Sequence, residues 1–185
     1  MISLEPEFIR KQDGHEKQDC EIAAGKRWLE AHGAYYAKEN VTLLGDDLYC
    51  HDPFCKKVRG KGFHFIFVCK PESQEMLYET VKFLEANGTL SCHTERRWNG
   101  RHGEIDTYRY ANELPLNGEP NAMQVNWCEL TITHEKTGEV IFRNAFATDF
   151  EVLETTVEAI VRDGRARWKI ENENNNVLKT KSYHL

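Results

Sequence analysis

The sequence predicts an α/β fold, and three features of the chain support this prediction. Residues 41–88 contain two short apolar runs, each followed by an amphipathic run, which is the order of a strand–helix–strand–helix unit with a parallel pair of strands. Residues 89–147 alternate polar and apolar positions and are rich in β-branched and aromatic residues, as antiparallel strands are. Residues after 147 carry apolar side chains at helical spacing.

Apolar spacing and helix-terminating residues define the elements of the first half. Apolar residues that recur every three or four positions predict helices, and short apolar runs with β-branched members predict buried strands. Glycine is expected just after a helix because it adopts the left-handed conformation there. The predicted elements are a helix over 17–32 ended by Gly33, a strand over 41–44, a short helix capped by Asp52 and closed by Gly60 or Gly62, a strand over 63–70, and a helix with Met76, Leu77, Val81 and Leu84 on one side, ended by Gly88.

The second half is expected to begin as an antiparallel β module over residues 89–147. The stretch HEKTGEV within it is typical of a hairpin turn between two strands. Thr148 or Asp149 then caps a helix whose apolar positions keep the helical period. Gly164 is expected to interrupt or bend this helix, which resumes over residues 165–181.

Composition indicates a cytoplasmic protein and leaves room for an anionic partner. No run reaches the roughly 18 apolar residues of a membrane span, and the N-terminal residues lack the apolar stretch of a signal peptide. The net charge of −6 argues mildly against a nucleic-acid partner. The basic stretches 56–62, 95–101 and 161–169 are each explained by a solvated surface, but together they are compatible with an anionic partner.

The six cysteines are expected to be reduced structural thiols. No two of them have the Cys-x-x-Cys spacing of a zinc knuckle or a redox motif, and a reducing compartment keeps isolated thiols reduced. Pairs such as His51 and Cys55 supply only two of the four ligands that zinc usually takes. A structural zinc protein is therefore kept only as an alternative.

Asp46 and Asp47 follow a predicted buried strand, at the edge of the sheet where α/β proteins gather their ligand sites. Since side chains alternate along a strand, only one of the two carboxylates is expected to point into a site. The alternative is that both are turn or capping residues, which is a common use of aspartate.

Glu171 lies one helical turn after Arg167 in the predicted last helix, and Trp168 follows Arg167 directly. One interpretation is a solvated ion pair between residues four apart. The other is a carboxylate that Arg167 keeps ionised for binding a hard divalent cation, with Arg167 also able to contact a phosphate. The residue pattern alone is compatible with both.

Two blocks of the sequence resemble conserved blocks of bacterial insertion-sequence transposases of the DDE type, whose catalytic domain has an RNase H-like fold. They are LLGDDLYCHDPFCKKVRGKGFHFIFVCK (43–70) and RARWKIENENNNVLKTKSYHL (165–185). The stretch KQDCEIAAGKRWL (17–29) resembles the segment before the first block in one subgroup. The similarity covers most of the chain and is weakest in the β module.

The resemblance implies a site in which three carboxylates bind two divalent metal ions, Mg²⁺ or Mn²⁺, which activate water or a DNA 3′-hydroxyl for attack on a phosphodiester. Asp46 matches the second carboxylate of the family, in an Asp-x-x-Tyr pattern that ends at Tyr49, and Glu171 matches the third. Arg167 matches the arginine of the family, and Lys179 lies one position beyond its lysine. Both residues are expected to contact DNA.

The resemblance also divides the chain into an N-terminal tail (1–16), the first part of an RNase H-like core (17–88), a β insertion (89–147) and a C-terminal helical part of the core (148–185). In the insertion, Arg96, Arg97 and Trp98 are expected to clamp or stack on transposon-end DNA. A structural role for Trp98 is the alternative.

Three departures from the family pattern matter. Gly164 stands where the family has a tyrosine, Leu178 stands where it has the lysine, and its first catalytic aspartate has no counterpart. We therefore expect the C-terminal two-thirds of a catalytic domain, truncated at the N-terminus and inactive, or nearly so, by itself.

The implied partner is double-stranded DNA with terminal inverted repeats, bound by a homodimer and associated with the nucleoid in the cytoplasm, without a membrane. Two alternatives share the fold. One is a non-enzymatic DNA-binding remnant of a transposase, and the other is a metal-dependent nuclease that needs no transposon ends.

Overall fold

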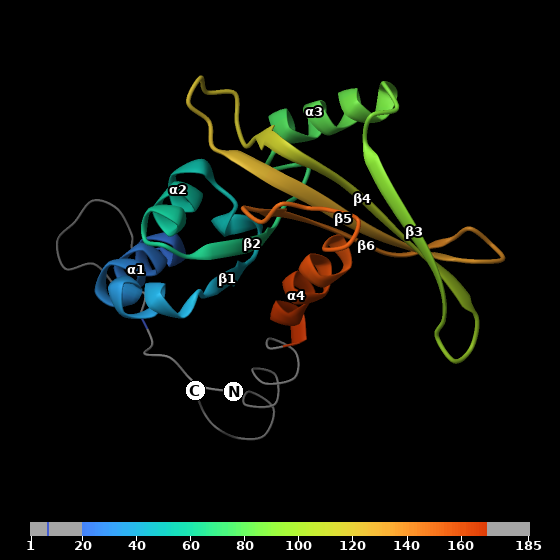
Figure 1. Cartoon of the computed structure of the whole chain (residues 1–185), viewed down its shortest axis with the longest axis horizontal. Coiled ribbons are helices and arrows are strands. Elements are labelled where there is room, and N and C mark those ends of the chain that lie inside the picture. The colour runs from blue at the N-terminus through green and yellow to red at the C-terminus, as the bar shows by residue number, and fades with distance from the viewer. Residues whose placement is uncertain (1–6, 8–19, 170–185) are drawn as a thin grey trace.

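The computed structural model describes Glu7 and residues 20–169 of the chain. Its strands form one six-stranded sheet in the order β1-β2-β6-β5-β4-β3 (Figure 1). The elements are α1 (Glu21–Tyr36), the 3₁₀ turn η1 (Ala37–Glu39), β1 (Thr42–Gly45), the 3₁₀ turn η2 (Asp47–Tyr49), α2 (Asp52–Gly60), β2 (His64–Val68), α3 (Glu75–Ala86), β3 (Ser91–Trp98), β4 (Gly103–Pro115), β5 (Gln124–His134), β6 (Val140–Thr148) and α4 (Val157–Lys169). This mixed arrangement confirms the predicted α/β class.

The sheet has a parallel part and an antiparallel part. β1 and β2 pair in parallel, with Leu44 opposite Ile66, as the strand–helix–strand pattern predicted. All the other neighbours are antiparallel, and Ile66 also lies opposite Thr148 of β6. Because β6 lies between β2 and β5, the strands of residues 91–148 continue the sheet that β1 and β2 begin.

Helices cover both faces of the sheet, and β2 shows why both are apolar. Successive side chains of a strand point to opposite faces, so Phe65 and Phe67 pack in the core beneath α1, α2 and α3. Ile66 and Val68 pack on the other side, in a core shared with α4. The fold thus has three layers, with α3 and α4 on opposite sides of the sheet (Figure 1).

Several predicted ends are confirmed. α3 ends next to Gly88, which takes a left-handed conformation with φ 67°, and the β5–β6 turn contains Gly138 with φ 71°.

The start of α2 differs slightly from the prediction, because Asp52 is its first residue and His51 is its cap. The Asp52 carboxylate is nearly buried and accepts a hydrogen bond from the backbone of Met123 at 2.5 Å.

Two predictions about the N-terminal half are wrong. Gly33 does not end the first helix, because α1 runs on to Tyr36 and Gly33 lies buried within it, close to the ring of Phe63. Met76 does not belong to the buried side of α3, since 41% of it is exposed, whereas Leu77 is fully buried.

The last helix begins later than predicted. Neither Thr148 nor Asp149 caps it, because α4 starts at Val157. The preceding segment is bound to the sheet instead: the side chain of Asn112 donates to Val152 O at 2.8 Å and accepts from Val152 N at 2.9 Å. These two bonds satisfy backbone groups that a helix would otherwise use.

Gly164 does not interrupt α4, which passes through it without a break. It is a point of close packing against Phe146 and Ile66. No helix in the part of the chain that the structure describes has the length and apolar character needed to cross a membrane.

Candidate functional site

Asp46 lies at the carboxyl end of β1, on the side of the sheet that α4 covers. Its backbone is extended (φ −81°, ψ −175°), so the alternation of β1 continues and Asp46 points to the same side as Thr42 and Leu44. Oδ1 of Asp46 accepts a hydrogen bond from Leu48 N at 3.0 Å. Oδ2 has no hydrogen-bond partner among the described residues, so this carboxylate keeps one oxygen for a ligand.

Asp47 has a different role. It accepts a hydrogen bond from Lys70 N at 2.9 Å with one oxygen and from the hydroxyl of Ser73 with the other. Both oxygens therefore fasten the end of β1 to the loop that follows β2. Asp46 caps η2 through its bond to Leu48 N, which is the capping role that the sequence left as the alternative, but its second oxygen has no partner among the described residues.

Tyr49 closes the same end of β1 from the other side. Its hydroxyl donates to Glu21 of α1 at 2.8 Å, a contact that sequence reasoning did not foresee. Burial, followed by the hydrogen bond to Glu21, raises the pKa of Tyr49 well above its usual value, so the phenol stays protonated. The backbone of Gly45 lies close to the Phe67 ring, because a Cβ atom on Gly45 would be 2.8 Å from Cδ1 of Phe67.

A groove runs beside Asp46 between the sheet and α4. Its volume is about 490 Å³, and most of its lining is apolar. Because Leu44 lines it and Asp46 follows two positions later on the same side, the carboxylate lies just beyond the groove at the carboxyl end of β1. The lining includes Thr42, Leu44, Ile66, Phe150, Asp163 and Ala166.

The structure describes only some of the other residues that were predicted for this site. Arg167 lies in the last described turn of α4, on the helix that covers the Asp46 side of the sheet. Glu171 and Lys179 lie outside the described residues. Within the described part of the chain, no group of three or more His, Cys, Asp or Glu side chains could hold a metal ion. Asp46 alone supplies one oxygen ligand, and a hard divalent cation takes about six, so described residues by themselves do not complete such a site.

The predicted DNA-contacting residues of β3 lie on two faces of the sheet. Arg96 and Trp98 point to one face and Arg97 to the other, because they alternate along the strand. Arg97 pairs with Glu104 and also with Asp106, at 2.8 Å, and both of these carboxylates are buried. A guanidinium here offsets the cost of burying two negative charges.

Arg96 pairs with Glu135 in the β5–β6 turn through two hydrogen bonds, one of them 3.0 Å long. This contact holds the pKa of Glu135 below its usual value. Trp98 is different, since 69% of it is exposed at the end of β3. Of the three predicted residues, Trp98 is thus the one that presents an unused aromatic surface to solvent.

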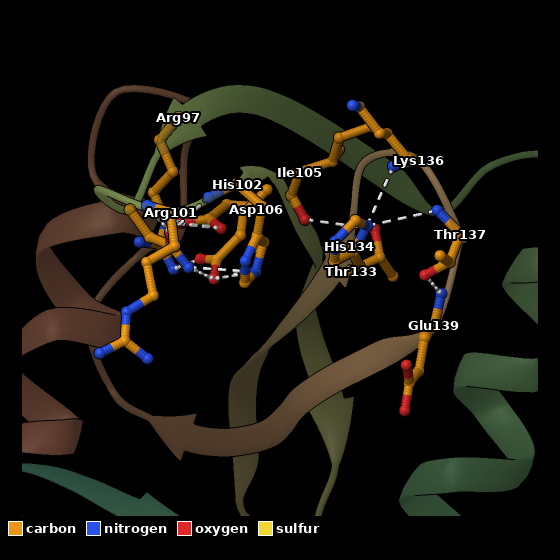
Figure 2. A network of polar contacts seen from close by, with 12 residues as sticks. Arg97, Arg101, His102, Ile105, Asp106, Thr133, His134, Lys136, Thr137 and Glu139 are labelled. Carbon is orange, nitrogen blue, oxygen red and sulfur yellow. Dashed lines mark hydrogen bonds and ion pairs between the residues drawn. The ribbon is translucent and has the colours of Figure 1, made fainter.

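The ends of the two hairpins meet at this end of the sheet (Figure 2). The rings of His102 and His134 stack with their centroids 4.4 Å apart, and Glu135 N donates to Gly103 O at 2.9 Å. The β3–β4 and β5–β6 turns are therefore fixed side by side. Both hairpins extend beyond the helices (Figure 1).

In comparisons with known proteins, no family model matches the chain, and no curated protein sequence matches it either.

Proposed function

We propose that this chain is a fragment of a DDE transposase of the insertion-sequence type, and that its α/β sheet is an RNase H-like catalytic core. In this proposal Asp46 is one metal-binding carboxylate and Glu171 another, and the partner is double-stranded DNA with terminal inverted repeats. The intact protein would act as a homodimer on DNA in the nucleoid.

The observation that carries the proposal is the position and the hydrogen bonding of Asp46. Its carboxylate lies at the carboxyl end of β1, a half-buried edge strand that pairs in parallel with β2, where α/β proteins bind ligands, and it keeps one oxygen free of hydrogen bonds to described residues. The neighbouring Asp47 does not share this property, since both its oxygens are used within the fold. Asp46 also caps η2 through its bond to Leu48 N, so a metal would bind at the oxygen that capping leaves open.

The metal would supply charge stabilisation at phosphorus, where attack on a phosphodiester concentrates negative charge. Asp46 would hold it together with carboxylates outside the described residues, Glu171 among them. Arg167 would help to position the DNA phosphates, as would Lys179. With two of the three expected carboxylates, we expect this chain alone to bind metal weakly and to cleave little or no DNA.

Metal binding at Asp46 can be measured directly with Mn²⁺ by isothermal titration or by the relaxation of water protons. We expect weak Mn²⁺ binding that the Asp46→Asn variant loses. The Glu79→Gln variant removes one exposed carboxylate from α3, far from β1 in the sequence, and should bind as the wild type does. Equal Mn²⁺ affinity of wild type and Asp46→Asn would contradict the assignment of this residue.

The substrate is tested with a nicking assay on duplex DNA that carries inverted-repeat ends, in Mg²⁺ or Mn²⁺. We expect salt-dependent DNA binding with little or no cleavage. Strong cleavage that Asp46→Ala and Glu171→Ala both abolish would support the site and overturn the expected inactivity. Cleavage that does not depend on the end sequence would favour a nuclease, and a chain that binds no DNA at all would end the proposal.

A further inference from the structure

Most of the positive charge on the antiparallel part of the sheet is already neutralised within it. Arg109 pairs with Glu129 and with Glu85 at 2.6 Å, and Arg143 pairs with Glu129 at 2.8 Å. Only 2% of Glu129 is exposed, so these two arginines compensate a buried charge. Arg97 likewise pairs with the buried Glu104 and Asp106, and Arg96 pairs with the partly exposed Glu135. These four arginines therefore offer little net charge to a partner.

Arg101 and Lys136 differ from these four residues. Each lies at the end of one hairpin and is exposed. Neither side chain makes a hydrogen bond or an ion pair with any residue that the structure describes; only their backbone groups are bonded. The nearest acidic neighbour of Lys136 in sequence, Glu135, is paired with Arg96. These are the two cations at this end of the sheet that remain available to an anion.

Both cations are held by ordered turns. Asn99 Oδ1 accepts from Arg101 N at 2.9 Å and from His102 N at 3.0 Å, and Gly100 supplies the left-handed conformation with φ 95°. In the other turn, His134 Nδ1 accepts from Lys136 N at 3.1 Å. The stacked rings of His102 and His134 join the two turns, as Figure 2 shows.

We propose that the two hairpin ends form one phosphate-binding surface, in which Arg101 and Lys136 contact the backbone of a DNA duplex. Trp98, exposed at the end of β3, lies at the border of this surface. The inference rests on the proposed function for the identity of the anion. It assigns the contact to residues that the sequence blocks did not indicate, and it leaves Arg97 to stabilise the fold.

The number of phosphate contacts can be read from the salt dependence of binding. For duplex DNA, log Kobs falls linearly with log salt concentration, with a slope of about −0.9 for each phosphate that the protein neutralises. The Arg101→Gln and Lys136→Gln variants should each make the slope less negative by about 0.9, and the double variant by about twice that. Binding should weaken to a similar degree for any duplex sequence, since phosphate contacts carry no sequence information.

The experiment uses fluorescence anisotropy of a labelled duplex with the full chain. The matched control is Lys82→Gln, which removes one exposed lysine from α3 and should leave the slope unchanged. Thermal unfolding of each variant checks that the fold is intact. If wild type binds DNA and the double variant keeps its slope, this inference is wrong while the proposed function stands. If wild type binds no duplex at any salt concentration, both are wrong.

Discussion

Gly164 and Phe146 lie closer together than a larger residue at position 164 would permit. A Cβ atom on Gly164 would be 2.7 Å from Cε1 of Phe146 and 3.0 Å from Cγ2 of Ile66. Phe146 is fully buried in the core between the sheet and α4, so its ring can move only by displacing other core side chains. The absence of a side chain at Gly164 thus allows α4 to pack directly on β2 and β6.

We therefore expect Gly164→Ala to destabilise the protein. Overpacking a core costs about 1–3 kcal/mol, while alanine in a helix gains about 1 kcal/mol over glycine, so the net loss should reach up to about 2 kcal/mol. Urea unfolding measures it. Gly60→Ala is the control, since a Cβ atom there would meet nothing within 4 Å and should be neutral or stabilising. Equal stability of Gly164→Ala and wild type would show that the helix can move away from the sheet.

Asp149 should be needed for stability. Its carboxylate is 7% exposed, accepts from Phe65 N at 2.8 Å and pairs with Arg59 at 2.7 Å. Asp149→Ala leaves a backbone N–H and a guanidinium without this acceptor, and hydrogen bonds to charged groups contribute about 1.5–3 kcal/mol. We expect a loss of that size in urea unfolding. Asp163→Ala breaks only an exposed pair with Arg162 and should change stability by less than about 0.5 kcal/mol. Similar small effects for both variants would contradict this view of Asp149.

Glu30 gives a pH dependence with a defined sign. Hydrogen bonds from Lys57 and then Lys61 lower its pKa from 4.5 to about 2. A carboxyl group whose pKa is lower in the folded than in the unfolded state stabilises the fold at pH values above the unfolded pKa. This stabilisation is lost as the pH falls toward and through the folded pKa. Between about pH 4.5 and 2, the melting temperature of Glu30→Gln should therefore fall less steeply than that of wild type. The difference should shrink at high salt, because Glu30 is exposed.

Glu79→Gln is the control for this experiment, since Glu79 is exposed and has no ion pair among the described residues. Its melting temperature should follow wild type over the same pH range. If the melting temperature of Glu30→Gln fell with pH as steeply as that of wild type, the contacts between α1 and α2 would not persist in solution.

The thiols should differ sharply in reactivity. The six cysteines, all within the described residues, form no disulfide; Cys20 and Cys92 are exposed and the other four are buried. Burial raises the pKa of Cys128 to about 12, so little thiolate forms there at neutral pH. With a chromogenic disulfide reagent at pH 8, two thiols should react quickly in the folded protein and the other four only after unfolding. Fast reaction of a third thiol would contradict the described packing.

Sequence pattern predicted the elements whose signals are local. The apolar run of β2, the glycine after α3 and the β5–β6 turn each carry their own signal within a few residues, and all three are present. The start of α4 could not be predicted in this way, because Asn112, about 40 positions earlier in the chain, holds Val152 in a non-helical segment. Nothing in the local sequence of that segment carries this information.

The candidate site was predictable to a similar extent. The position of Asp46 after a short apolar run and the alternation rule were enough to expect that the two aspartates would differ, one of them with a structural role. The identity of the structural one depended on its contact with Ser73, a loop residue whose position only the fold defines. Likewise, the two arginines of β3 looked equivalent in sequence, but strand alternation directs Arg97 toward the buried Glu104 and Arg96 toward Glu135.

The position of β6 has one more consequence. It is hydrogen-bonded to β5 on one side and to β2 on the other, and β2 is bonded to β1. The β3–β4 turn that holds Arg101 and the end of β1 that precedes Asp46 thus belong to one hydrogen-bonded sheet. If both proposals hold, the sheet fixes the spacing between the DNA phosphates bound at Arg101 and the place where the Asp46 carboxylate would act.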